Sequence, residues 1–339
     1  MYSVYQHWDP LKVCIVGKSY PPEFYNFIKN SRVRKVFERI AEETEEDYQK
    51  LVTLLETFNV QVLRPTIVDQ THYLDLNNRY IPPPMSPRDY AITIDNDFYF
   101  KVNQYSKWDH ATWGNVINAV KPHVNLKLKG PEFLYNLNSA TNTRVGKDIY
   151  IGTGEYGQDI SGSLNGMSGL YPNHRFHRVD TGGHSDAVFC PVVPGLIVSL
   201  QEIQTYAESF PGWEVIYLEN QSWDQVRPFL DLKTKNNGKW WVPGEELNDD
   251  FTEFVESWLG HWVGYVEETV FDVNMLVINE KNVVCNNYNK TVFDAFDRYG
   301  ITAHLVNFRH RFFWDGGLHC ITVDVAREGK MNDYFPKRG

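Results

Sequence analysis

Pairs of short apolar runs separated by tight polar turns recur along the chain. In each pair, two stretches rich in β-branched and aromatic residues flank a turn that carries Asp, Asn, Gly or Pro, which is typical of a β-hairpin. Four such hairpins are predicted, over residues 90–102, 142–152, 186–200 and 274–286. Because one pattern repeats, it predicts a repeated structural unit.

A helix and a further strand are predicted after the last two hairpins. Residues 201–210 have a helical pattern and precede an apolar strand at 213–219. Residues 290–300 predict a helix that stops at its final glycine, before a strand at 301–308. Each of these units therefore reads as strand, strand, helix, strand.

The first two hairpins are followed by the same elements in weaker form. A short helical pattern at 111–120 precedes a strand at 124–130 after the first hairpin. After the second, a glycine-rich connector leads to a strand at 175–180. These two units match the pattern only in part.

A fifth unit is predicted to be split between the two ends of the chain. Residues 320–326 supply one strand and residues 11–17 its partner, followed by an amphipathic helix at 33–58 and a strand at 60–65. This pairing would close a ring without a free edge. We therefore predict an α/β fold: one domain over residues 1–339, a five-fold pseudosymmetric ββαβ propeller with the active site on its central axis.

Polar or nucleophilic residues stand at the entrance of each predicted unit. They are Asp89, Asn138, His184, Asp186, Glu267, Glu268, Asp272 and Cys320. Because the entrances of all units would converge on the axis, these side chains are predicted to line one cavity. Glu267 and Glu268 cannot both face inward if that stretch is extended, since neighbouring side chains of a strand point to opposite faces.

Cys320 is the candidate nucleophile. The other cysteines, Cys14, Cys190 and Cys285, lie inside apolar runs that are typical of buried filler, and no CxxC pair suggests a zinc site. Only a thiolate attacks well, so Cys320 needs a lowered pKa or a nearby base. His184, which follows two glycines, is the candidate base, and Asp186 would lie on the same face of a strand.

The charge balance restricts the class of ligand. A formal net charge of -10 without a long basic run argues against a nucleic acid or an anionic membrane as partner, and suits a small cationic substrate. The apolar stretches fall short of the roughly 20 residues that span a bilayer, and the N-terminus lacks the pattern of a secretion signal. We expect a soluble cytoplasmic protein.

One stretch imitates a nucleotide-binding motif. Residues 152–157, GTGEYG, match GxGxxG after an apolar strand. That fingerprint also needs a well-formed helix directly after the glycines, whereas the next twelve residues are polar and contain Gly162, Gly166 and Gly169. We therefore predict neither a helix here nor a dinucleotide.

Seven stretches taken together resemble the arginine:glycine amidinotransferase family of the pentein superfamily of guanidine-modifying enzymes. They run in order over nearly the whole chain, at 7–17, 85–90, 144–151, 182–199, 274–284, 299–302 and 316–329. The resemblance implies the five-fold propeller predicted above. It also implies a homodimer.

The resemblance also implies roles for single residues. Cys320 matches the nucleophile, His184 the general acid and base, Asp186 the carboxylate two residues later, and Asp89 the substrate-binding aspartate of a Pro-Arg-Asp motif. The expected substrate-binding set is completed by neighbours of these positions and by one acidic residue: Arg88, Gly317, His319 and Glu268.

The sequence departs from the family at three places. Asn138 stands where the family has a catalytic aspartate, and it can form hydrogen bonds but carries no charge. The arginine that would bind the donor's carboxylate has no evident match. Glu267 or Glu268 stands near a small hydroxyl residue of the family, which would suit an acceptor with an additional amine.

The resemblance implies a reaction that transfers an amidino group from arginine, or a similar guanidine, to a primary amine such as glycine. Ornithine is released as an amidino-cysteine intermediate forms, and no metal or organic cofactor is required. Two alternatives stay open. In a hydrolase of the arginine deiminase type, water would replace the amine. In a non-catalytic pentein, the fold would serve only for binding.

Overall fold

The computed structural model describes residues 2–68, 80–102, 107–134, 137–155, 157–200, 202, 206–218, 240–260, 262–263 and 272–338. Five three-stranded sheets share one arrangement in this part of the chain. In each, the middle strand is antiparallel to one neighbour and parallel to the other. The repeated unit predicted from the hairpins is therefore confirmed.

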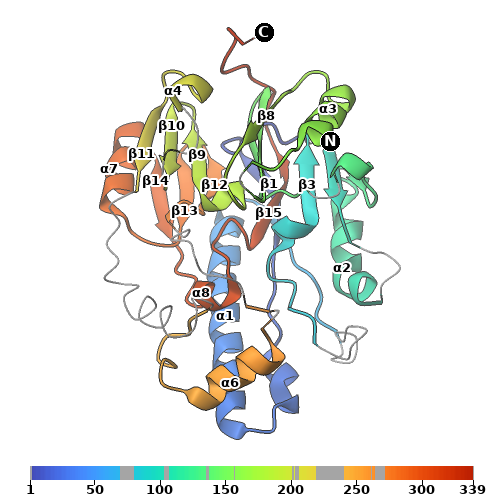
Figure 1. Cartoon of the computed structure of the whole chain (residues 1–339), viewed down its shortest axis with the longest axis vertical. Coiled ribbons are helices and arrows are strands. Elements are labelled where there is room, and N and C mark those ends of the chain that lie inside the picture. Colours follow the sequence, from blue (N-terminus) through green and yellow to red (C-terminus); the bar gives the residue numbers. More distant parts are fainter. Residues whose placement is uncertain are drawn as a thin grey trace.

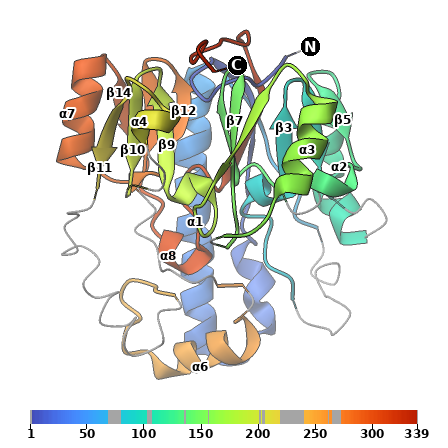
Figure 2. The same cartoon turned by 45° about the horizontal axis from the view of Figure 1, so that its top comes forward.

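Four of the sheets are built from consecutive strands. Their strands are β3 (Ala91–Ile94), β4 (Asp97–Phe100) and β5 (Asn125–Lys127); β6 (Asn142–Val145), β7 (Asp148–Gly152) and β8 (Arg175–Val179); β9 (Phe189–Val193), β10 (Leu196–Ser199) and β11 (Glu214–Tyr217); and β12 (Leu276–Asn279), β13 (Asn282–Cys285) and β14 (Thr302–Leu305). A helix precedes the third strand of each: α2 (Lys107–Val120), α3 (Ser161–Leu170), α4 (Tyr206–Ser209) and α7 (Lys290–Tyr299). Figures 1 and 2 show α7, α2 and α3 on the outside of the sheets.

The fifth sheet joins the two ends of the chain, as the sequence predicted. β15 (Thr322–Arg327) pairs antiparallel with β1 (Leu11–Val16), and β2 (Gln61–Leu63) pairs parallel with β1. Between β1 and β2 runs α1 (Ser31–Thr57), whose N-terminus is capped by the side chain of Asn30.

The prediction that glycines would prevent a helix after residue 157 was wrong, because α3 forms there. A Cβ on Gly166 would lie 2.5 Å from the Phe133 ring, so this glycine lets the helix pack closely against that side chain. The helix begins at Ser161, and thus does not open directly at the GTGEYG glycines. Of the helix expected over 201–210, α4 occupies 206–209, and residues 201 and 203–205 lie outside the described residues.

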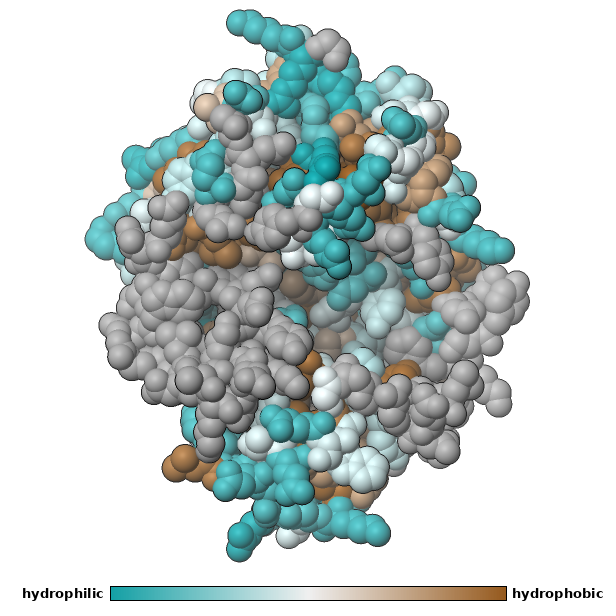
Figure 3. All heavy atoms as spheres, in the orientation of Figure 1, coloured by the Kyte–Doolittle hydropathy of each residue, from teal (hydrophilic) through white to brown (hydrophobic). Residues whose placement is uncertain are grey.

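Below the sheets in Figure 1, α1 packs with η1 (Pro22–Phe27), α6 (Asp249–Trp258) and α8 (Arg311–Trp314). We call the aromatic core around these helices the aromatic base; its buried rings are Tyr20, Phe24, Tyr25, Phe37, Tyr48, Trp240, Phe251, Trp262, Phe308, Phe313 and Trp314. The surface over α6 is mostly hydrophilic (Figure 3), so these rings lie beneath it. No helix among the described residues combines the length and apolarity needed to cross a membrane.

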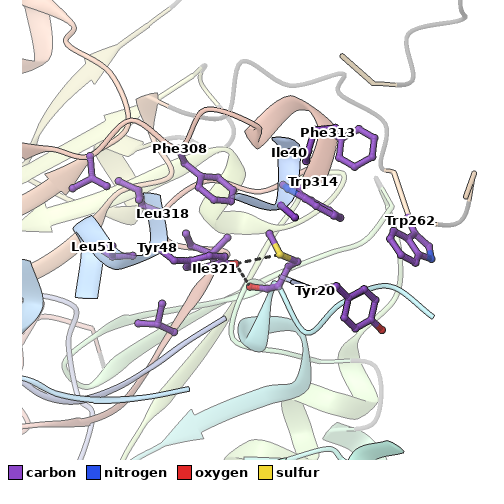
Figure 4. Packing of buried hydrophobic residues seen from close by; sticks show 14 of the residues in the cluster. Tyr20, Ile40, Tyr48, Leu51, Trp262, Phe308, Phe313, Trp314, Leu318 and Ile321 are labelled. Atoms are coloured by element: carbon purple, nitrogen blue, oxygen red, sulfur yellow. Dashed lines mark hydrogen bonds between the residues drawn. The ribbon is translucent and has the colours of Figure 1, made fainter. Parts of the chain in front are cut away.

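Three short 3-10 helices complete the described structure: η3 (Pro87–Tyr90), η4 (Glu132–Leu134) and η5 (Ser185–Ala187). The turn at 318–321 connects the aromatic base to the site. Leu318 and Ile321 point into the base together with Tyr48 and Leu51 of α1 (Figure 4), whereas the two residues between them face polar groups. One side of the turn that carries Cys320 therefore packs against the base.

Candidate active site

The Cys320 thiol is enclosed two residues before β15 and is 8% exposed. Its Sγ accepts a hydrogen bond from Asn274 Nδ2 at 3.1 Å and lies 3.7 Å from Asp186 Oδ2. A Cβ on Gly317 would lie 2.6 Å from Asn274 Oδ1, so the space expected for a guanidinium at this glycine is filled by Asn274. The structure thus gives Gly317 a packing role, and its contact with substrate stays a prediction.

Asp186 and His319 form a buried pair beside the thiol. His319 Nδ1 donates to Asp186 Oδ2 at 2.7 Å, while Asp186 Oδ1 has no hydrogen-bond partner among the described residues. Burial and the Arg88 charge lower the pKa of His319 to about 4, so its ring is neutral at physiological pH. Burial alone would raise the pKa of Asp186, but the His319 hydrogen bond and nearby positive charges outweigh it and lower the pKa. Asp186 therefore presents an ionised carboxylate with one unoccupied oxygen.

Arg88 lies next to this pair and is fully buried. Its Nε donates to the carbonyls of His319 at 2.7 Å and Thr322 at 2.8 Å, and its Nη2 donates to Asp324 at 3.3 Å. It therefore holds the turn that carries Cys320, and this geometry favours a positioning role over the substrate contact expected from the sequence.

Two further buried guanidinium groups share the same carboxylate. Arg144 and Arg327 donate to Asp324 Oδ2 at 2.6 and 2.8 Å. Burial alone would raise the pKa of Asp324, but the three arginines outweigh it and hold that pKa well below its usual range. We call Arg88, Arg144, Arg327 and Asp324 the arginine cluster.

His184 and Asp89 form the solvent-exposed edge of the site, which we call its entrance. His184 precedes η5, Asp89 lies in η3, and the two side chains are each 42% exposed with Nδ1 and Oδ1 3.9 Å apart. Desolvation by the surrounding protein and the charge of Asp186 raise the pKa of Asp89 to about 6, whereas the charge of His184 lowers it. The structure thus brings together the predicted base and the predicted substrate-binding aspartate.

Asp315 adds a carboxyl group that the sequence reasoning missed. It ends α8 in the left-handed region, with φ of 51°, directly before the glycine whose Cβ would lie 3.3 Å from Cys320 Cβ. Desolvation raises the pKa of Asp315 to about 6. The charge of His184 lowers this pKa, and the charge of Asp89 raises it. The entrance therefore combines two carboxyl groups with one histidine, an arrangement that suits a cation.

The thiol itself is protonated at neutral pH. Burial raises the pKa of Cys320 well above its usual value, and the Asp186 and Asp89 charges raise it further, while Asn274 opposes them. A cation bound between these carboxylates and the sulfur would offset their charge and favour the thiolate.

The side chain of Asn138 forms hydrogen bonds within its own turn. Its Oδ1 accepts hydrogen bonds from the backbone N–H groups of Ala140 and Thr141, both at 3.1 Å, so the side chain shapes the loop before β6. A catalytic role for Asn138 stays a prediction. Glu267 and Glu268 lie outside the described residues. No group of three or more His, Cys, Asp or Glu side chains in the described part of the chain is arranged to hold a metal ion.

Asn274 is the second residue that the sequence reasoning missed. It lies two residues before β12, at the entrance of the last unit, where the sequence analysis selected acidic residues instead. The signal that identified Asp89 and His184, a polar residue just before a buried strand, also applies to Asn274. Asn274 donates a hydrogen bond to the sulfur.

Comparisons with known proteins extend over almost the whole chain. No family model matches the sequence. The mitochondrial glycine amidinotransferase of Xenopus tropicalis is 22% identical over an alignment of 391 residues, which covers 98% of this chain and 84% of the relative. The L-arginine:L-lysine amidinotransferase of Pseudomonas savastanoi pv. phaseolicola is 25% identical over 210 residues, covering 60% of this chain and 48% of the relative.

Solved structures show the same fold. The inosamine-phosphate amidinotransferase of Streptomyces griseus has a TM-score of 0.65 at 17% identity, over 98% of this chain and 99% of that one. An amidinotransferase of the saxitoxin pathway of Microseira wollei also has a TM-score of 0.65, at 15% identity and the same coverage. A dimethylarginine dimethylaminohydrolase reaches 0.52 at 13% identity, over 92% and 99%. The comparisons confirm the predicted resemblance to amidinotransferases and support an enzyme of that class.

Proposed function

We propose that the protein transfers an amidino group from arginine, or a similar guanidine, to a primary amine through a covalent amidino-Cys320 intermediate. One observation carries the proposal: the buried carboxylate of Asp186 lies 3.7 Å from the thiol and has an oxygen without a partner among the described residues. A guanidinium group supplies planar N–H donors for such an oxygen and places its carbon beside the sulfur.

In the first step, the guanidinium group binds Asp186 and Asp89, and its charge favours the Cys320 thiolate. The thiol proton passes to His184, Sγ attacks the guanidinium carbon, and a tetrahedral intermediate forms. His184 then donates that proton to the departing amine nitrogen, the C–N bond breaks, and ornithine leaves when arginine is the donor. The amidino group remains on sulfur.

In the second step, a primary amine enters the open side of the site. The amine nitrogen attacks the amidino carbon while His184 accepts a proton from the amine. The C–S bond breaks, sulfur leaves as the thiolate and regains a proton, and a new guanidino compound is released. Arginine and amine are thus converted into ornithine and the guanidino product with no net change in protons.

The proposal includes a fold closed into a five-fold ββαβ propeller, one domain with this site on its axis. The shared strand arrangement of the five sheets supports it. The homodimer and the cytoplasmic location belong to the same proposal as predictions.

A hydrolase of the deiminase type is the second candidate, with water as the attacking group in the second step. The likeness to a dimethylarginine dimethylaminohydrolase, at a TM-score of 0.52, favours considering it. A non-catalytic pentein is the third, because Asn138 replaces the family's aspartate.

Product analysis separates these candidates. The protein is incubated with arginine and a panel of amines that includes glycine and lysine. Transfer predicts ornithine and a new guanidino compound in equal amounts, both lost in Cys320→Ala. Citrulline with ammonia would indicate the hydrolase, and no product with any donor would favour the binding protein.

A further inference from the structure

We propose that Asn274 is a catalytic residue of the proposed reaction: its amide N–H holds Cys320 Sγ and stabilises the thiolate when it forms and when it leaves. The proposal rests on the proposed function for its reaction, and on the geometry for the contact. Asn274 Nδ2 lies 3.1 Å from Sγ, and Asn274 is fully buried.

One amide group bonds to three of the residues that form the enclosed site. Asn274 Nδ2 also donates to the carbonyl of Asp186 at 3.1 Å. Asn274 Oδ1 accepts from the backbone N–H groups of His319 at 2.9 Å and Cys320 at 3.2 Å. Both N–H bonds and both oxygen lone pairs of the side chain are therefore in use.

This bonding fixes which end of the amide faces the sulfur. If the group were rotated by half a turn, its NH2 would meet the two backbone N–H donors of His319 and Cys320, and its oxygen would meet the Asp186 carbonyl. Donor would then face donor and acceptor would face acceptor. Asn274 is therefore held with its N–H toward Cys320, whatever the protonation state of the thiol.

The position of Asn274 is itself constrained. Its backbone carbonyl accepts from Asn286 Nδ2 at 3.0 Å, and its side chain occupies the space beside Gly317, where a Cβ would come within 2.6 Å of Oδ1. A side chain at position 317 would displace the amide. Gly317 is thus needed so that Asn274 can reach the sulfur.

The chemistry explains why such a donor is needed. Asp186 and Asp89 are suited to a cationic substrate, and the same charges disfavour a thiolate beside them. A hydrogen bond to an ionised acceptor is roughly twice as strong as one to a neutral acceptor. The Asn274 N–H therefore stabilises the thiolate more than the thiol, both before attack and as sulfur departs from the amidino carbon.

The test measures the reactivity of Cys320 with iodoacetamide from pH 7 to pH 9.5, with the alkylated peptide identified by mass spectrometry. Asn274→Asp keeps the shape but turns an acceptor with a negative charge toward sulfur. Each unit by which the thiol pKa rises lowers the alkylation rate about tenfold at a given pH below it. We expect a loss of about tenfold or more for Asn274→Asp and a smaller loss for Asn274→Ala.

Asn289→Ala is the matched control. Asn289 caps α7 in the same unit, so its loss destabilises the protein without touching the sulfur. We expect its alkylation rates to equal those of the wild type. Gly317→Ala is an independent variant that should slow alkylation in the same direction by displacing the amide, should either Asn274 variant fail to fold.

The outcomes separate this inference from the proposed function. Alkylation rates within twofold of the wild type for folded Asn274→Asp and Gly317→Ala would overturn the inference. So would wild-type kcat in Asn274→Asp; we expect kcat to fall while KM for the donor is unchanged. If the wild type forms no product and Asn274→Asp still slows alkylation, the proposed reaction is wrong and the hold of Asn274 on the thiol stands.

Discussion

The aromatic base and the arginine cluster are both buried, yet they are built by opposite means. The base is a cluster of packed aromatic and apolar side chains on and around α1, η1, α6 and α8. The cluster gathers three guanidinium groups on the Asp324 carboxylate under the site. Apolar contacts tolerate exchange when volume is kept, whereas a buried charge depends on its partner. The comparison predicts that changes in the two regions have different consequences.

The largest effect is expected for Asp324→Asn in the arginine cluster. This substitution leaves Arg144 and Arg327 without the carboxylate that they share. Breaking a buried ion pair in this way costs about 3–5 kcal/mol of unfolding free energy. Urea unfolding measures it, and a loss of about 0.5 kcal/mol, as for a surface substitution, would show that the cluster is not needed for stability.

In the aromatic base, Leu51→Ala should cost about 2–5 kcal/mol, because a fully buried side chain leaves a cavity. The turn that carries Cys320 keeps its hydrogen bonds to Arg88 in this variant, so at a temperature where the variant is folded the alkylation rate of Cys320 should stay close to that of the wild type. Thr53→Ala, on the exposed face of the same helix, is the control. A tenfold fall in Cys320 reactivity in Leu51→Ala would remove the distinction between the two regions.

At the entrance of the site, activity should depend on the ionised forms of Asp89 and Asp315. The pKa of each is raised to about 6, so each carries its charge above that pH and loses it below. We expect kcat/KM for a guanidine donor to fall by about tenfold per pH unit below 6 if one ionised carboxylate is required. Asp315→Asn should raise KM by up to about fivefold, since an exposed ion pair contributes at most about 1 kcal/mol. An unchanged KM in Asp315→Asn would exclude that residue from binding.

The smallest effect concerns stability at the same place. A raised pKa means that ionising Asp89 is less favourable in the folded than in the unfolded protein. This cost is present above about pH 6 and is lost as pH falls toward the ordinary carboxyl pKa near 4. Asp89→Asn should therefore raise Tm by about 2 °C or less at pH 7.5, and not at pH 4. A lower Tm at pH 7.5 would contradict the raised pKa of Asp89.

Local patterns were sufficient to predict the strands and most helices, because a period of two residues marks each hairpin and Gly300 ends α7 in the left-handed region. The split fifth sheet was predicted because the strands at the two ends of the chain complete one further copy of the repeated unit. The helix α3 was missed because its glycines suggested a break in the chain. One of them, Gly166, is needed for close packing against Phe133, and this contact joins residues that are distant in sequence.

The candidate site was predicted less completely, for a physical reason. Cys320, His184 and Asp89 stand at entrances of units, and the repeat makes that position visible. The bonds of Asn274 to Asp186, His319 and Cys320 join segments that lie more than forty residues apart. Arg88 resembled a substrate ligand because its motif does not show that carbonyl groups surround its guanidinium.

Mass spectrometry of the protein after brief exposure to arginine alone tests the central claim most directly. We predict that one amidino group is added to Cys320, that it is absent from Cys320→Ala, and that a primary amine removes it while a guanidino product appears. Product formation without any modification of Cys320, or an amidino group on another residue, would contradict the account.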